Sequence, residues 1–346
     1  MLVIRADAST AIGTGHVMRT LALAQAWLDK GGKVVFASAE LPDALQRRLT
    51  AEGLLTHQLD VEPGSDRDAD ETLAIAGKYQ AQWVVVDGYR LTASYRDTLA
   101  GSGLNVLRVD DFEDTGRPDT TLLLNQNLGA VADLYPNWHD PERLLLGPRY
   151  ALIRRELLVA VPKPRSHAQT APRILVTLGG SDPDNQTLKV VRALQTVPAK
   201  DLEAAILVGA GNPHTESLRQ AVADDRRLRL HYDVQNMGDL LSWADMAISA
   251  AGGSAWERAL FGLPSLTMIL ADNQIRVAAA LDRHGWSTNL GWFHQITVPQ
   301  LTDAVCSFMN DKPRREGQSR RSQQAVDGHG AARTVDAMDR WCRGQD

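Results

Sequence analysis

The sequence predicts an α/β protein with two doubly wound, Rossmann-like domains that face each other across a cleft. Short apolar runs alternate with amphipathic segments along most of the 346 residues, as strands alternate with helices in such folds. The apolar runs are continuous rather than alternating, which is typical of parallel strands covered on both faces. An apolar run followed by a glycine turn opens the chain at residues 1–15, and the same pattern returns at 173–180.

The first half of the pattern predicts one domain over residues 1–160. Its predicted strands are residues 1–7, 34–38, 83–89, 105–111 and 121–127. Amphipathic segments at 16–32 and 42–53 predict helices, and glycines close the first of them.

A second domain is predicted over residues 173–346, after a linker at 161–172 that is rich in proline and has no periodic apolar face. Its predicted strands are residues 173–180, 204–211, 246–253 and 265–270. Its predicted helices are residues 185–194, 215–224, 253–262 and 273–285, followed by a terminal helical segment. The last helix could instead fold back onto the first domain, and no motif in the sequence decides this.

Composition excludes several classes of function. A net charge of −5 gives no basic field for nucleic acid. No apolar run is long enough for a membrane span, so no membrane partner is expected. Cys306 and Cys342 predict two free thiols in a reducing, cytoplasmic compartment. No cluster has metal-ligand spacing, so we expect neither a metal nor another cofactor, and the sequence leaves the oligomeric state open.

The first candidate site is the strand-to-helix junction at residues 5–19. Gly13 and Gly15 allow backbone amides to approach a ligand, and a helix start favours negative charge. The loop lacks both the lysine of a P-loop and the third glycine of the dinucleotide fingerprint. His16 lies where the helix dipole disfavours a protonated imidazole, so it suits a general base, and Arg19 suits an anion. The alternative is a histidine that only caps or packs.

Asp87 and Tyr89 end the strand at 83–89, on the same predicted sheet edge as the first loop. A carboxylate or a tyrosine at this place could contact a sugar. An ordinary loop between strand and helix is the alternative.

Two glycine junctions follow predicted strands of the second domain. At the first, Gly180 and Ser181 approach the cleft, with Ser181 or Asp182 available as a helix N-cap, and a plain capped turn is the alternative. At the second, Gly252, Gly253 and Ser254 offer backbone amides and a hydroxyl that suit a diphosphate. The carboxylate of Glu257 suits two ribose hydroxyls. Ser254 and Glu257 also match an S-x-x-E capping box, and both interpretations can hold together.

A third polar junction follows the strand at 265–270. With Asp272 as the N-cap of the next helix, Asn273 and Gln274 would point their amides toward the cleft. Plain capping is again the alternative.

Five stretches, taken in order, resemble the UDP-sugar hydrolases of pseudaminic acid biosynthesis, the PseG family. They are IRADASTAIGTGHVMR, VVDGY, LGGSD, SAAGGSAWERALFGLP and ILADNQ, and YALIRRE at 150–156 also resembles the family. The resemblance spans about residues 1–285, and no later motif matches. The family is similar to the GT-B glycosyltransferases, MurG among them, so the resemblance implies a GT-B-like fold.

The resemblance implies that UDP-2,4-diacetamido-2,4,6-trideoxy-β-L-altropyranose is hydrolysed to UDP and the free sugar by water attack. It implies that His16 is the general base, that Tyr89 and Asn273 lie near the sugar or the water, and that Gly252–Ser254 and Glu257 hold the diphosphate and ribose. The predicted partner is therefore a small-molecule UDP-sugar, whose stereochemistry the sequence leaves open.

Two other functions are kept open. One is a GT-B glycosyltransferase that moves a sugar from a UDP donor to an acceptor, and the other is a sugar-nucleotide-binding protein without catalysis. The single histidine of GTGHVMR favours the hydrolase, because the MurG-type loop has an additional glycine before its histidine. The presence of that histidine also disfavours the non-catalytic protein.

Overall fold

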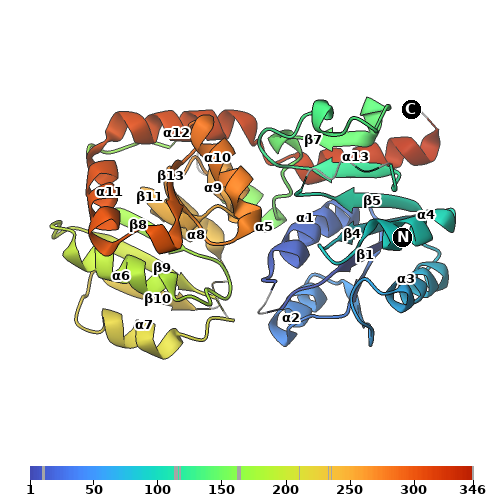
Figure 1. Cartoon of the computed structure of the whole chain (residues 1–346), viewed down its shortest axis with the longest axis horizontal. Helices are drawn as coiled ribbons and strands as arrows, with labels where there is room; N and C mark the ends of the chain where they lie inside the picture. Colours follow the sequence, from blue (N-terminus) through green and yellow to red (C-terminus); the bar gives the residue numbers. More distant parts are fainter. Residues whose placement is uncertain are drawn as a thin grey trace. The chain divides into compact units, whose positions relative to one another are not determined.

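The computed structural model describes residues 1–9, 12–112, 116, 118–161, 165–209, 211–232, 234 and 236–344. The chain divides into two compact units (Figure 1). Unit 1 consists of Met1–Arg155 and Gly328–Asp346, and unit 2 consists of Glu156–Asp327.

Unit 1 contains a seven-stranded parallel sheet in the order β3-β2-β1-β4-β5-β6-β7. The strands are β1 (Leu2–Ala6), β2 (Val34–Ser38), β3 (Leu55–Gln58), β4 (Trp83–Asp87), β5 (Asn105–Val109), β6 (Leu122–Asn125) and β7 (Leu144–Leu146). The helices are α1 (Gly15–Asp29), α2 (Asp43–Ala51), α3 (Asp66–Lys78), α4 (Ala93–Gly101) and α13 (Gly330–Arg343), with short 3-10 turns at Ala132–Leu134, Pro141–Arg143 and Pro148–Tyr150.

The core of unit 1 lies on both faces of this sheet. Leu2 and Ile4 of β1 pack into the cluster that contains residues of α1 and α13, whereas Val3 packs into the cluster under α3 and α4. All three side chains are fully buried. Because successive side chains point to opposite faces, an apolar residue is needed at every position, which explains the continuous apolar runs.

Unit 2 repeats the architecture with a six-stranded parallel sheet in the order β10-β9-β8-β11-β12-β13. The strands are β8 (Arg173–Thr177), β9 (Glu203–Val208), β10 (Leu228–Tyr232), β11 (Met246–Ala250), β12 (Ser265–Ile269) and β13 (Thr288–Trp292). The helices are α5 (Arg155–Leu158), which begins at the unit boundary, α6 (Gln186–Thr196), α7 (Thr215–Val222), α8 (Met237–Trp243), α9 (Ser254–Leu260), α10 (Ile275–Arg283), α11 (Val298–Asn310) and α12 (Lys312–Ala325), with 3-10 turns η4 (Asp272–Gln274) and η5 (Phe293–Gln295).

The predicted fold class of two Rossmann-like parallel sheets is confirmed. The strands that the sequence did not reveal include β3, β10 and β13, which lie at sheet edges. Their residues are largely half-buried or exposed, so they carry no continuous apolar run.

The predicted second domain, 173–346, is wrong at its end, because α13 belongs to unit 1. Ala331, Val335 and Met338 of α13 are buried in the same cluster as Leu2. The indole Nε1 of Trp83 also lies 3.1 Å from Cys342 Sγ. An amphipathic helix packs on whichever apolar face is uncovered, and its own periodicity does not name that face.

The predicted linker, 161–172, is also corrected. Arg165 donates hydrogen bonds to the carbonyls of Leu241, Ala244 and Phe261, and Ala171 is buried in the unit 2 core. The described part of this segment therefore packs on unit 2, and the chain passes between units after Arg155. Residues 162–164 lie outside the described part of the chain.

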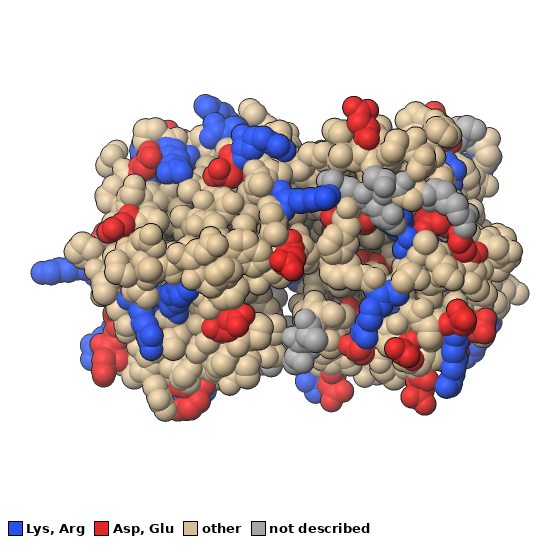
Figure 2. Space-filling view, viewed as in Figure 1, with Lys and Arg blue, Asp and Glu red and all other residues tan. Residues whose placement is uncertain are grey.

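Charged side chains of both signs are interspersed on the face seen in Figure 2. This distribution agrees with the modest net charge of −5. Within the described residues, no helix combines the length and the apolar character that crossing a bilayer requires.

Substitution of Met338 by alanine tests the assignment of α13. Met338 is fully buried, so Met338→Ala should lower the free energy of unfolding by about 2–5 kcal/mol. Hydrogen exchange should show the loss in the amides of β1 and β4 and leave those of β8 and β11 unchanged.

The matched control is Asp339→Ala on the same helix, whose carboxylate pairs with Lys30 at the surface. An exposed pair contributes about 1 kcal/mol or less, so this variant should remain close to the wild type. Faster exchange in β8 and β11 of Met338→Ala would place α13 on unit 2 instead.

Candidate functional site

The candidate residues of unit 1 meet at one edge of its sheet. β1, β4 and β5 are neighbours, and parallel strands bring their carboxyl ends to the same edge. The loop to His16 follows β1, Asp87 and Tyr89 end and follow β4, and Asp111 follows β5. Topology alone therefore gathers side chains that lie far apart in sequence.

The first loop turns through its glycines and leaves open space around them. Ser9 and Gly13 form an isolated antiparallel bridge, and Gly13 has a φ of 76°, where a side chain would be strained. Gly15 is the first residue of α1. Among the described residues other than its chain neighbours, none has an atom within 4 Å of a Cβ placed on either glycine, so a ligand has room to approach this backbone.

His16 is held by Asp87. Its Nδ1 lies 2.7 Å from Oδ1 of Asp87, and both side chains are buried. A carboxylate only accepts hydrogen bonds, so Nδ1 carries the proton of this contact, and in the neutral imidazole Nε2 is then the acceptor. The pair therefore gives His16 the tautomer that a general base needs.

Arg19 joins this pair to a second carboxylate. It donates through Nε and Nη2 to Asp87, at 2.6 Å each, and through Nη1 and Nη2 to Asp111, at 2.8 Å each. Burial alone would raise the pKa of Asp87, but the charge of Arg19 and the hydrogen bonds from Arg19 and His16 hold that pKa well below its ordinary value. Burial alone would also raise the pKa of Asp111, but the charge of Arg19 and its hydrogen bonds lower that pKa.

These contacts engage the charged groups of Asp87 and Arg19 within the protein. Asp87 is fully buried, and both of its oxygens accept hydrogen bonds. The guanidinium of Arg19 is directed at two carboxylates. That these two groups also bind substrate stays a prediction.

Tyr89 remains at the surface beside His16. Its ring lies 4.7 Å from the imidazole in an edge-on arrangement, and its hydroxyl donates to Asp111 Oδ2 at 3.2 Å. Phe112 also packs against Tyr89, with ring centroids 4.7 Å apart. About half of each of these two aromatic residues is exposed, so they form an apolar wall open to solvent next to the histidine.

The candidate residues of unit 2 also gather at one sheet edge. β8, β11 and β12 are neighbours, and their carboxyl ends lead to Gly180, to Gly252–Glu257 and to Asn273 and Gln274. A Cβ atom on Gly252 would lie 3.9 Å from Nε2 of Gln274, so the second and third junctions are close together. Asn273 is exposed, whereas Glu257 is partly buried.

Two of the expected helix caps are not formed. The N-cap of α9 is Gly253, and no side-chain capping bond is present, so the capping box of Ser254 and Glu257 is absent. Likewise Ala271, not Asp272, precedes η4, and Asp272 makes no capping bond. Neither Ser254 nor Asp272 therefore has its side-chain oxygen committed to a helix start.

The junction after β8 is built for close backbone approach. Gly179 has a φ of 100°, and a Cβ atom on Gly209 would come within 2.2 Å of the carbonyl oxygen of Gly180. The N-cap of α6 is Asn185, so the prediction of Ser181 or Asp182 as the N-cap is wrong, although the carboxylate of Asp182 accepts from the amides of Gln186 and Thr187 at 2.8 Å each. Ser181 therefore stays free of the capping role.

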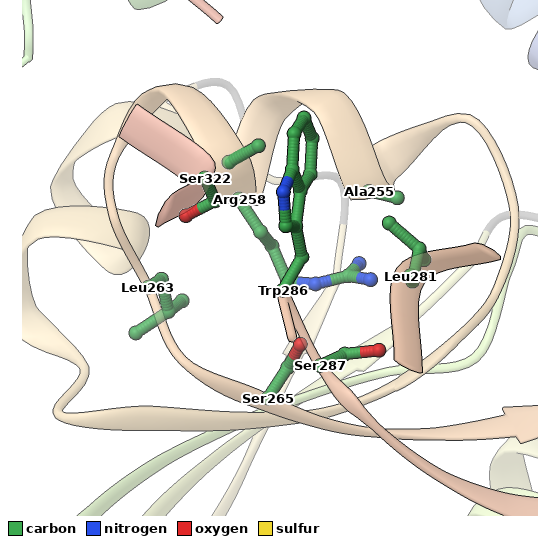
Figure 3. Close-up of a pocket in the computed structure, with 9 residues that line it drawn as sticks. Ala255, Arg258, Leu263, Ser265, Leu281, Trp286, Ser287 and Ser322 are labelled. Atoms are coloured by element: carbon green, nitrogen blue, oxygen red, sulfur yellow. The ribbon is translucent and has the colours of Figure 1, made fainter. Parts of the chain in front are cut away.

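Arg258 supports the α9 junction from inside the unit. Its Nη1 donates to Ser254 Oγ at 3.0 Å and its Nη2 to the carbonyl oxygen of Ala250 at 3.4 Å. Figure 3 shows this side chain in a small cavity beside Trp286, with the hydroxyls of Ser265 and Ser287 nearby. Burial lowers the pKa of Arg258 to about 10, opposed by the charge of Glu257. No described residue forms a salt bridge or an Nε hydrogen bond with this guanidinium.

The sequence analysis missed Asp111, Phe112 and Arg258. Asp111 could have been found, since it follows a predicted strand as Asp87 does. Phe112 and Arg258 carry no comparable signal, because a single aromatic in a loop and a single arginine in an apolar helix are common. Among the described residues, no group of three or more His, Cys, Asp or Glu side chains could hold a metal ion.

No family model matches this sequence. It is 27% identical over 199 residues to the spore coat polysaccharide biosynthesis protein SpsG of Bacillus subtilis, covering 57% of this chain and 56% of that protein. It is 24% identical over 289 residues to the UDP-2,4-diacetamido-2,4,6-trideoxy-β-L-altropyranose hydrolase of Campylobacter jejuni, covering 82% of this chain and 97% of that protein. An uncharacterized protein of Methanocaldococcus jannaschii is 20% identical. The matched regions span 56% of that protein and 56% of SpsG, so this chain matches little more than half the length of either.

Solved structures share the fold at low sequence identity. A putative UDP-N-acetylglucosamine 2-epimerase from Listeria monocytogenes has a TM-score of 0.74 at 12% identity, covering 100% of this chain and 97% of that one. MurG of Acinetobacter baumannii has a TM-score of 0.68 at 16% identity, covering 98% of this chain and 99% of that one. This chain therefore shares the fold of these structures, with two Rossmann-like domains.

Replacement of Asp87 by asparagine tests the buried ion cluster. Because the folded-state pKa of Asp87 is lowered, its charge stabilises the fold above the unfolded-state value of about 4 and ceases to do so as pH falls through the folded-state value. Asp87→Asn should therefore cost about 3–5 kcal/mol of unfolding free energy at pH 7, and the difference from the wild type should shrink below about pH 4.

Urea unfolding of both proteins between pH 7 and pH 2 measures this difference. Asp60→Asn, at an exposed position of the same unit, is the matched control and should show no such pH trend. A difference between Asp87→Asn and the wild type that stays constant down to pH 2 would contradict the assignment.

Proposed function

We propose that this chain hydrolyses a UDP-linked 2,4-diacetamido-2,4,6-trideoxy sugar to UDP and the free sugar, a step of pseudaminic acid biosynthesis. The observation that carries the proposal is the buried His16–Asp87 pair at the carboxyl edge of the unit 1 sheet. The likeness to the Campylobacter jejuni hydrolase over most of both chains supports the choice of reaction.

His16 is the proposed general base. Water attacks the anomeric carbon while His16 Nε2 takes one of its protons, and the bond from that carbon to the diphosphate oxygen breaks. The electron pair leaves with UDP, and the proton passes from His16 to solvent. Asp87 stabilises the imidazolium that forms during this step. A single displacement inverts the anomeric centre, by the logic of inverting glycosidases.

The proposed diphosphate site is the edge of unit 2. Gly253 is exposed and Gly252 is partly buried, and the buried cation Arg258 lies behind Ser254 without a bonded carboxylate among the described residues. Positive charge near a leaving diphosphate stabilises the transition state, so little acid assistance is required. Glu257 on the same helix is the proposed partner of the ribose hydroxyls.

The remaining candidates are assigned to the sugar side of the substrate. Tyr89 and Asn273 are exposed and suit contacts to the sugar or the attacking water. Gly13 and Gly15 give the open backbone that the sugar approaches, and Gly180, Ser181 and Gln274 complete the unit 2 side. Arg19 acts through Asp87, as a positioning residue.

Incubation with the UDP-diacetamido-trideoxy sugar in ¹⁸O-labelled water, without any acceptor, tests the reaction. We expect UDP release with the label in the free sugar and none in the phosphates, because water attacks carbon. Mass spectrometry of both products reads the result.

The same assay separates the alternatives. UDP release that requires an added acceptor would instead indicate a glycosyltransferase, and UDP-sugar binding without turnover would indicate a non-catalytic protein. Label in the phosphate would show attack at phosphorus and contradict the proposed step.

His16→Asn tests the base. Loss of a positioned base should lower kcat about 10²- to 10⁴-fold, while UDP affinity measured by calorimetry stays within about twofold of the wild type. The control is His139→Asn, at an exposed position of the same unit, which should keep full activity. Unchanged turnover in His16→Asn would remove His16 from the mechanism.

A further inference from the structure

A small pocket of unit 1 contains a carboxylate that the proposed mechanism does not use. Asp7, at the end of β1, lines this pocket together with Ile12, His16, Tyr89 and Leu91. The side chain of Asp7 is only 9% exposed. A nearly buried acceptor therefore shares a pocket with the proposed general base.

One oxygen of Asp7 is fully engaged and the other is not. Oδ1 accepts from Arg5 Nη1 at 2.6 Å, from the amide of Ala39 at 2.8 Å and from the amide of Glu40 at 3.1 Å. Within the described part of the chain, no hydrogen bond is made to Oδ2. The side chain of Asp7 keeps 9% of its surface accessible at the pocket, so Oδ2 is a candidate for a bond to a ligand.

The position of Asp7 is fixed by a buried network. Arg5 is fully buried and donates to both oxygens of Asp68, at 2.8 and 2.7 Å, in addition to its bond to Asp7. Tyr95 also donates to Asp68, at 3.2 Å. The carboxylate of Asp7 therefore cannot turn away without leaving the Arg5 cation partly unpaired, which is costly in the interior.

Apolar and aromatic side chains form much of the remaining wall, which also includes Gly88 and Arg90. Leu91 is buried, the ring of Tyr89 stands edge-on to His16, and Ile12 is 37% exposed at the pocket. An acceptor-only carboxylate beside apolar walls matches a group with an N–H donor and a methyl. A sugar hydroxyl supplies only the donor, whereas an acylamino group supplies both.

We propose that Asp7 determines substrate specificity by accepting the N–H of an acylamino group on the sugar, whose acyl methyl packs on Ile12 and Leu91. This inference rests on the proposed function in that it places the sugar of a UDP-sugar in the unit 1 pocket. It goes further by naming the residue that selects acylamino sugars over sugars with hydroxyls alone.

Calorimetric titration with UDP, UDP-glucose and UDP-N-acetylglucosamine tests the inference. The wild type should bind UDP-N-acetylglucosamine at least about tenfold more tightly than UDP-glucose, the range for one hydrogen bond to a charged group. Asp7→Asn turns the acceptor into an amide, and it should reduce this preference to about twofold or less while affinity for UDP alone is unchanged.

Two controls separate recognition from folding. Asp68→Asn removes one charge from the same Arg5 network without touching the pocket, so the acylamino preference should survive in it. Ile12→Ser changes a partly exposed wall residue and should reduce the preference without affecting the fold. Val131→Ser, at a residue 51% exposed elsewhere in unit 1, is the matched control for Ile12→Ser.

Each failure is distinguishable. Equal affinity of the wild type for the two UDP-sugars, or an unchanged preference in Asp7→Asn, overturns the inference. If Asp7→Asn does not fold, an unchanged preference in Ile12→Ser overturns it. The hydrolase proposal is tested separately by UDP release in labelled water, so absent turnover with an intact Asp7-dependent preference would reject only the hydrolase.

Discussion

The buried carboxylate of Asp87 is the contact on which the arrangement of unit 1 depends. It accepts from His16 on one oxygen and from Arg19 on both, and Arg19 in turn holds Asp111. A fully buried carboxylate is stable only when it is paired and hydrogen-bonded. The same contacts that stabilise the buried charge therefore also fix the orientation of the His16 imidazole.

The two units have the same architecture but different charged groups at their sheet edges. In unit 1, carboxylates at the sheet edge are paired with a histidine and an arginine, so their charges are largely satisfied within the protein. In unit 2, backbone amides lie at the edge and the buried cation of Arg258 has no salt bridge to a described carboxylate. The first arrangement suits proton transfer, and the second suits an anion that the protein itself does not supply.

Asp7 and Asp87 lie at neighbouring strand ends but differ in how many of their oxygens are hydrogen-bonded within the protein. Asp7 follows β1 and Asp87 ends β4, and these strands pair directly, with Ala6 opposite Asp87. Both oxygens of Asp87 are engaged internally, whereas Asp7 keeps one oxygen without a described partner beside the same histidine. One carboxylate thus acts on the protein and the other is available to a ligand.

The sequence by itself determined the fold class, the strands buried on both faces and the strand ends at which candidate residues lie. These features are local, since continuous apolar runs and glycine turns are written in neighbouring residues. Only the tertiary structure decided that Asp87 bonds to His16, 71 positions away, and that α13 packs on unit 1. Those outcomes depend on strand order and on which apolar face is left uncovered, which are long-range properties that no local pattern encodes.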